Sequence, residues 1–177
     1  MKRLIAGLCA GLLMVSAGQV SADPTVTRSP ATAPTLGTTI RGSSASTFSI
    51  TAAGAVTRTS GNAIRLTTSS VTTPTITINC GLLNLSSLCA LRYIRVTISP
   101  VSGTGPATIT RFRVASLTGG TYRTSAPAEA STLTFDINPL GLATTATFKL
   151  GMDVQLAANA ASGNQTFDYL VTVQFTT

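Results

Sequence analysis

The side chains of this sequence that could do chemistry are few and widely separated. The chain of 177 residues contains no histidine, and its five carboxylates are Asp23, Glu129, Asp136, Asp153 and Asp168. Without histidine there is no serine–histidine–aspartate triad, and most nucleophilic sites need an activating base of this kind. The aspartates at 136, 153 and 168 alternate with apolar residues, which favours solvent-facing positions over a converging pair for glycoside hydrolysis. The sequence therefore predicts a protein that is not an enzyme.

The cysteines are the next reactive groups. Cys80 and Cys89 lie in the main part of the chain, and Cys9 lies in an N-terminal apolar segment. In an exported protein, a single remaining pair of cysteines most simply forms a disulfide. A loop this short contributes about 2.5–3 kcal/mol if it is unstrained. The alternative, a metal-binding or redox pair, lacks a histidine and a Cys-x-x-Cys motif. We therefore expect a disulfide and neither a metal nor a cofactor.

The N-terminus has the features of a secretory signal peptide. Lys2 and Arg3 precede an apolar run over residues 4–15, and small residues up to Ala22 precede a cleavage point at Asp23. The alternative is a membrane-spanning helix, but the apolar run is shorter than the roughly 20 residues that a bilayer requires. We expect residues 1–22 to be removed. The mature protein would then be periplasmic, at the cell surface or extracellular, without a membrane span.

The basic residues outside this signal peptide are dispersed. The formal net charge is +7 at pH 7, and Lys2 and Arg3 account for part of it. Most of the other basic residues stand singly on predicted outer strand faces, as Arg65, Arg95 and Arg113 do. Dispersed charge is more typical of solubility than of a polyanion site, so no specific nucleic-acid partner is predicted. Weak attraction to anionic polymers of the cell surface remains an alternative.

Two period-two runs near the C-terminus predict long strands. Phe148, Leu150, Met152, Val154 and Leu156 share one face of the first, and Phe167, Tyr169, Val171, Val173 and Phe175 share one face of the second. A polar turn containing glycine and asparagine separates the runs, so we expect a β-hairpin. The second run reaches the final residues, and we expect no tail, anchor or further domain after it.

Further strands are predicted at regular intervals. Alternating apolar residues mark them near residues 47–52, 64–66, 75–80, 93–98, 110–114 and 133–137, with turn residues between them. Ile109 is out of phase with Phe112, which predicts a β-bulge. With the C-terminal pair this gives about eight strands and an all-β sandwich or barrel. We expect the β-domain to span residues 47–177.

Residues 23–46 are predicted to be an extended arm rich in serine, threonine, proline and glycine, outside the core. Its larger apolar residues, Leu36 and Ile40, are even-numbered, as are Phe48 and Ile50. We hypothesise that the arm pairs as a strand with a sheet edge, its own or a neighbour's. The arm residues would be Leu36, Thr38, Ile40 and Gly42, and the acceptor edge would be Phe167, Tyr169, Val171, Val173 and Phe175. The alternative is a plain leader before an ordinary first strand.

The C-terminal pattern resembles a known group of proteins. Phe148, Leu150, Gly151, Val154 and Leu156, a glycine-bearing turn, and the alternating residues from Phe167 to Phe175 look like those of poorly characterised bacterial exported domains with pilin-like β-sandwiches. They also resemble spore coat U and chaperone–usher fimbrial subunits. The resemblance implies an immunoglobulin-like antiparallel sandwich completed by a strand from the next subunit. Two features depart from it: Thr176 replaces a frequent penultimate aromatic residue, and the span from Cys80 to Cys89 is short. A self-contained sandwich is therefore an open alternative.

Two functions follow from these expectations. The first is a non-catalytic structural or adhesive protein of the cell surface, which self-associates or joins related subunits by β-strand addition, with a periplasmic chaperone as a further partner. The second is a monomeric secreted immunoglobulin-like module that binds a glycan or another surface protein. The sequence does not identify the ligand.

Overall fold

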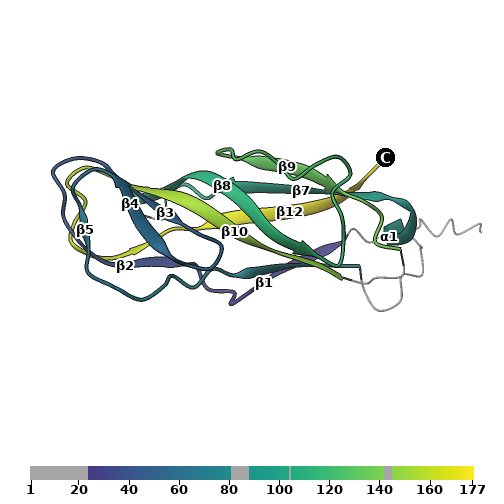
Figure 1. Cartoon of the computed structure of the whole chain (residues 1–177), viewed down its shortest axis with the longest axis horizontal. Helices are drawn as coiled ribbons and strands as arrows, with labels where there is room; N and C mark the ends of the chain where they lie inside the picture. The colour runs from purple at the N-terminus through teal and green to yellow at the C-terminus, as the bar shows by residue number, and fades with distance from the viewer. Residues whose placement is uncertain (1–23, 81–87, 104, 142–144) are drawn as a thin grey trace, which may run out of the picture.

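The computed structural model describes residues 24–80, 88–103, 105–141 and 145–177, and in these residues it is almost entirely antiparallel β-structure (Figure 1). The strands are β1 (Thr25–Ser29), β2 (Thr35–Ile40), β3 (Ser46–Ile50), β4 (Val56–Ser60), β5 (Ile64–Arg65), β6 (Thr75–Asn79), β7 (Tyr93–Pro100), β8 (Ala107–Thr118), β9 (Leu133–Ile137), β10 (Thr145–Leu156), β11 (Gly163–Thr166) and β12 (Tyr169–Thr176). A short helix, α1 (Leu88–Leu91), precedes β7. The predicted all-β class is confirmed, with more strands than the eight expected.

The largest sheet is organised around β10. One edge of β10 pairs with β8, while its other edge pairs first with β6 and then with β3. The change of partner falls at Gly151, where a Cβ atom would lie 3.1 Å from the carbonyl oxygen of Ile50. β1 extends the sheet beyond β6, and β4 extends it beyond β3. The predicted inward face of β10 is confirmed, because Phe148, Leu150 and Val154 are all buried.

Two three-stranded sheets complete the fold. One has the order β12-β7-β9 and the other has the order β11-β2-β5. All three sheets contribute to one apolar core: Phe148 comes from the largest sheet, Val96 from β7 and Leu36 from β2. Apolar faces packed together between antiparallel sheets are the arrangement of a β-sandwich.

The predicted C-terminal hairpin is wrong. β10 pairs with β8, β6 and β3, whereas β12 pairs with β7 in another sheet. The segment between them forms β11, which pairs with β2. Both runs do turn an apolar face to the core, but they do so from different sheets. Period-two alternation specifies which face of a strand is buried and leaves its hydrogen-bonded neighbour undetermined.

The bulge predicted at Ile109 is confirmed. The pairing of β8 with β10 shifts register between Arg111 and Ile109, so that Thr110 is the extra residue. Ile109 and Phe112 are consequently both buried although an odd number of positions separates them. A single extra residue in one strand reverses the alternation on either side of it.

The N-terminal arm is part of the fold, which corrects the expectation that it lies outside the core. Residues 24–46 supply β1, β2 and the start of β3, and Leu36 is 0% exposed. Gly37 has φ of +85°, and the pairing of β2 with β11 skips Leu36. This irregularity reverses the alternation, so Thr39 is buried and Ile40 is 41% exposed. Leu36 and Ile40 therefore do not share one buried face.

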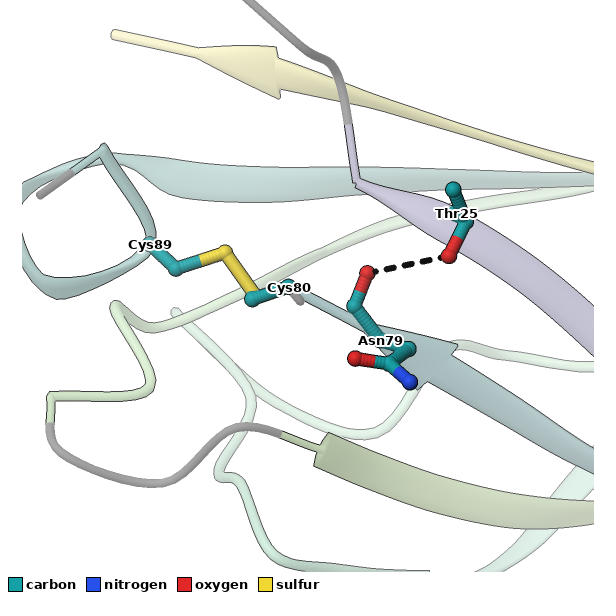
Figure 2. Close-up of a disulfide and its surroundings, with 4 residues drawn as sticks. All are labelled: Thr25, Asn79, Cys80 and Cys89. Atoms are coloured by element: carbon teal, nitrogen blue, oxygen red, sulfur yellow. Dashed lines mark hydrogen bonds between the residues drawn. A yellow bond between two sulfur atoms is a disulfide. The ribbon is translucent and has the colours of Figure 1, made fainter. Parts of the chain in front are cut away.

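The predicted disulfide joins Cys80 to Cys89, whose Cα atoms are 6.2 Å apart (Figure 2). Cys80 directly follows β6 and Cys89 lies in α1, just before β7, so the bond links two different sheets. Beside it, the hydroxyl of Thr25 in β1 donates to the carbonyl oxygen of Asn79 at 3.2 Å. The predicted signal peptide, residues 1–22, lies outside the described residues. Among those described, no helix is long and apolar enough to cross a membrane.

Candidate functional site

The candidate site is the edge of β12 that faces away from β7. β12 pairs with β7 along its whole length, from Tyr169 opposite Pro100 to Thr176 opposite Tyr93. Within the described residues, no strand pairs with the other edge of β12. β1 lies beside the start of that edge without forming a ladder with it. An unpaired strand edge is a template for the strand of another chain.

The hydrogen-bonding direction of each residue in β12 follows from its pairing. The amide of Val101 donates to the carbonyl oxygen of Asp168 at 3.0 Å, which makes this an exchange position of the antiparallel ladder. Hydrogen-bonded and non-hydrogen-bonded pairs alternate along such a ladder. The even-numbered residues of β12 therefore direct their amide and carbonyl groups to β7. Those of Val171, Val173 and Phe175 are directed to the free edge.

The start of this edge is closed by an arginine from β1. Arg28 forms an ion pair with Asp168 at 2.5 Å, and its Nη1 also donates to the carbonyl oxygen of Tyr169 at 3.3 Å. Its guanidinium lies over the ring of Tyr169, 5.4 Å from the centroid. The hydrogen bond from Arg28 holds the pKa of Asp168 below its usual range and raises that of Arg28 itself. Arg28 thus joins β1 to the start of β12, although the two strands do not pair.

A hollow of about 320 Å³ lies next to this contact and is lined by residues of both strands. Its apolar lining includes Val26 of β1, Ile76 of β6 and Val171 of β12. Further along β12, Val173 and Phe175 pack against the core and remain partly exposed. Tyr169, at the start of the same face, is only 3% exposed. The inward face of β12 is therefore covered at Tyr169 and only partly covered at Val171, Val173 and Phe175.

Tyr169 carries an unsatisfied polar group at the closed end of the edge. Its hydroxyl oxygen is buried and has no hydrogen-bond partner among the described residues. Its ring meets that of Phe112 edge-on, with centroids 6.0 Å apart. Burial raises the pKa of Tyr169 to about 12, so the phenol stays neutral at physiological pH. This side chain acts as part of the core rather than as an acid or base.

The structure brings together only part of the predicted site. Of the predicted acceptor residues, Tyr169, Val171, Val173 and Phe175 lie on β12. Phe167 precedes that strand, and its amide donates to the carbonyl oxygen of Pro34 at 3.3 Å, so it is not part of the free edge. The predicted arm residues lie elsewhere: β2, which holds Leu36, Thr38 and Ile40, pairs with β11 and β5 of its own chain and not with β12. Gly42 is beside the turn that joins β4 to β5, where a Cβ atom would lie 2.6 Å from the amide nitrogen of Ala63.

Sequence reasoning missed the other wall of the hollow. Val26 and Arg28 of β1 belong to a short alternating stretch, which was a weak strand signal between the predicted signal peptide and a proline-containing segment. The contact of Arg28 with Asp168 joins residues that are remote in sequence, so the local sequence pattern does not predict it.

The carboxylates are also placed differently from the expectation. Asp136 contacts Arg95, directly opposite it on β7, and Arg123. Asp153 and Glu129 contact Arg111 and Arg113. The side chains of Asp136 and Asp153 are only 14% and 15% exposed, so they are not free solvent-facing groups. Among the described residues, no three histidine, cysteine or carboxylate side chains gather into a metal site.

No protein-family model, no curated protein and no solved structure matches this chain. Its function is therefore inferred from its own residues and geometry.

Proposed function

We propose that this protein is a non-catalytic structural or adhesive component of the bacterial cell surface, exported by its signal peptide and folded as an immunoglobulin-like sandwich. It associates with further copies, or with related surface subunits, by β-strand addition at the free edge of β12. A periplasmic chaperone would occupy the same edge before assembly.

The observation that supports this proposal is the coincidence of free backbone groups with an uncovered apolar face. Val171, Val173 and Phe175 direct their amide and carbonyl groups outward, and the same three side chains are only partly covered. An added strand would gain main-chain hydrogen bonds from the edge, and its alternate side chains would cover the apolar face. The hollow lined by Val26 and Val171 would receive the first inward-facing side chain of the added strand.

The donor is an extended segment of another chain with apolar residues at alternate positions. In the structure the arm strand β2 closes its own sheet, because its partners β11 and β5 belong to the same molecule. Exchange of β2 between copies would place Leu36 in the same core position of the neighbour, between its β11 and β5, and would leave the edge of β12 free. Such an exchange is therefore a second route to association and not the source of the strand added to β12. Exchange of an identical element is a low-cost route to association.

Two neighbouring substitutions test the edge. An inward-pointing charge protects a strand edge from pairing, so Val173→Lys should block association. Thr172→Lys introduces the same charge on the exposed face and should leave association unchanged. The mature protein and both variants are compared by size-exclusion chromatography with light scattering over a range of concentrations, with thermal melting as a control for folding. Equal association of both variants would refute β12 as the assembly edge.

Amide exchange gives an independent test. In the unassembled protein, the amides of Leu170, Thr172 and Gln174 should be protected by β7, and those of Val171, Val173 and Phe175 should exchange quickly. Assembly should protect the second set. A wild-type protein that stays monomeric at every concentration, with these three amides always exposed, contradicts the proposal.

The second candidate function is the monomeric binding module. It is favoured by one observation: β2 completes its sheet within the molecule and buries Leu36 fully, as in a self-contained fold. A strictly monomeric wild-type protein would make this the better account.

A further inference from the structure

Arg58 and Arg65, in the strands at one end of the molecule, have no acidic partner among the described residues; the same holds for Arg41 and Arg92, which lie outside the strands. The four carboxylates Glu129, Asp136, Asp153 and Asp168 form ion pairs with Arg28, Arg95, Arg111, Arg113 and Arg123. Arg58 of β4 and Arg65 of β5 form no ion pair with any carboxylate in the described part of the chain. Figure 1 shows β5 and the adjoining end of β4 at the tip of the molecule opposite α1.

Both guanidinium groups are held in place by backbone carbonyls. Nη1 of Arg58 donates to the carbonyl oxygen of Ala63 at 2.8 Å. Arg65 donates from Nε to the carbonyl oxygen of Leu36 at 2.5 Å and from Nη2 to that of Ser69 at 2.7 Å. Each arginine keeps further N–H groups that have no acceptor among the described residues. These contacts fix the two side chains and leave their charges uncompensated.

The two arginines line the same hollow, which has a volume of about 770 Å³. Val56 and Ile64 supply apolar surface, and Ile64 is 51% exposed. Thr67 and Thr68 supply hydroxyl groups, of which that of Thr67 also accepts from the amide of Thr38 at 3.0 Å. Arg65 is half-buried, and burial lowers the pKa of its guanidinium. A partly desolvated cation that has carbonyl acceptors but no acidic partner keeps an uncompensated charge, and a bound anion with matching hydrogen-bond geometry offsets that cost.

We propose that this hollow binds the carboxylate or sulfate group of an acidic saccharide. Arginine presents a planar fork of N–H donors that matches both groups. The hollow is much larger than either group alone and falls in the range of sites for small organic ligands, about 300–1,000 Å³. The threonine hydroxyls and apolar wall suit a sugar ring, and the open side lets a polymer continue into solvent. This site is at a distance from the edge of β12 and adds to the strand-addition function.

Binding of the mature protein to polysaccharides of defined charge tests the proposal. Polygalacturonate carries carboxylates, dextran sulfate carries sulfates, and neutral dextran carries neither. We expect saturable binding to one or both of the charged polymers and none to neutral dextran; comparing their affinities tells which anion is preferred. Failure to bind either charged polymer at low salt overturns the proposal. Equal affinity for polyglutamate would assign the hollow to acidic polypeptides and overturn the saccharide assignment.

Matched variants separate a site from general attraction. Arg58→Gln should weaken binding at least about tenfold, the effect of losing charge-assisted hydrogen bonds. Arg92→Gln removes the same charge from an exposed position next to α1, at the other end of the molecule, and should change the affinity less than about twofold. An equal loss in both variants means dispersed electrostatics and refutes the site. Arg65→Lys keeps the charge without the fork and should weaken binding as well. Val173→Lys should bind normally, which distinguishes failure here from failure of strand addition.

Discussion

Truncating two apolar side chains of β2 tests whether the N-terminal arm belongs to the core. Leu36 is 0% exposed and Ile40 is 41% exposed, although they are on the same strand and both were expected on one face. Replacement of a fully buried leucine by alanine removes its burial energy and leaves a cavity, and typically costs about 2–5 kcal/mol. We expect Leu36→Ala to lower the free energy of unfolding by about 3 kcal/mol. Ile40→Ala should cost about 1 kcal/mol or less, because much of its side chain already contacts water.

Urea unfolding and thermal melting of the mature chain with its disulfide intact measure this difference. For a domain of this size, 1 kcal/mol shifts the melting temperature by about 2–4 °C, so Leu36→Ala should melt about 6–12 °C below the wild type. Leu36→Val provides an intermediate loss if the alanine variant does not fold. Similar small shifts for Leu36→Ala and Ile40→Ala would refute the assignment of β2 to the core. They would restore the view of the arm as a peripheral leader.

Four further predictions concern single groups. Thiol titration of denatured, unreduced mature protein should find no free thiol, and two thiols per chain would contradict the disulfide. The folded-state pKa of Asp168 lies below its unfolded value, so its ion pair with Arg28 stabilises the fold at neutral pH and is lost as the pH falls. In urea titrations between about pH 5 and pH 2, Asp168→Asn should therefore lose less stability than the wild type does. Tyr169→Phe should be neutral or stabilising in chemical denaturation, since the hydroxyl has no partner, and a loss above about 1 kcal/mol would reveal one. Val171→Asp should destabilise by about 1–3 kcal/mol, and Gln174→Lys, on the exposed face, by about 0.5 kcal/mol or less; equal melting of the two would mean that the faces of β12 are misassigned.

Local patterns predicted the strands well where one face is strongly apolar. The alternation in β10 and β7 identified both strands and their buried faces, and the out-of-phase Ile109 identified a bulge. β1 and β4 were missed because their exposed faces dominate and threonine occupies many of their positions. The irregularity at Gly37 in β2 was not predicted, since a glycine in a segment rich in serine, threonine and proline indicates a turn as readily as a bulge.

The candidate sites were predictable only in part, because they depend on which strands become neighbours. The alternation of apolar residues predicted the buried face of β12. Its free edge could not be predicted, because it depends on β7 being the only described strand that pairs with β12. The lack of a carboxylate partner for Arg58 and Arg65 could not be predicted from the sequence either. It becomes apparent only when the ion pairs formed by the described carboxylates are known. Contacts between remote residues carry no local signature.

The position of β10 in its sheet determines when that sheet can be completed during synthesis. β3, β6 and β8 all precede β10 in the chain, and each is joined to the others through it. A polypeptide growing from its N-terminus can form the pair of β3 with β4 and the pair of β1 with β6. The second edges of β3 and β6, and the edge of β8 that pairs with β10, then stay open. Such edges promote aggregation of the nascent chain. A ribosome that stalls before β10, which begins at Thr145, would therefore release a fragment with several exposed strand edges.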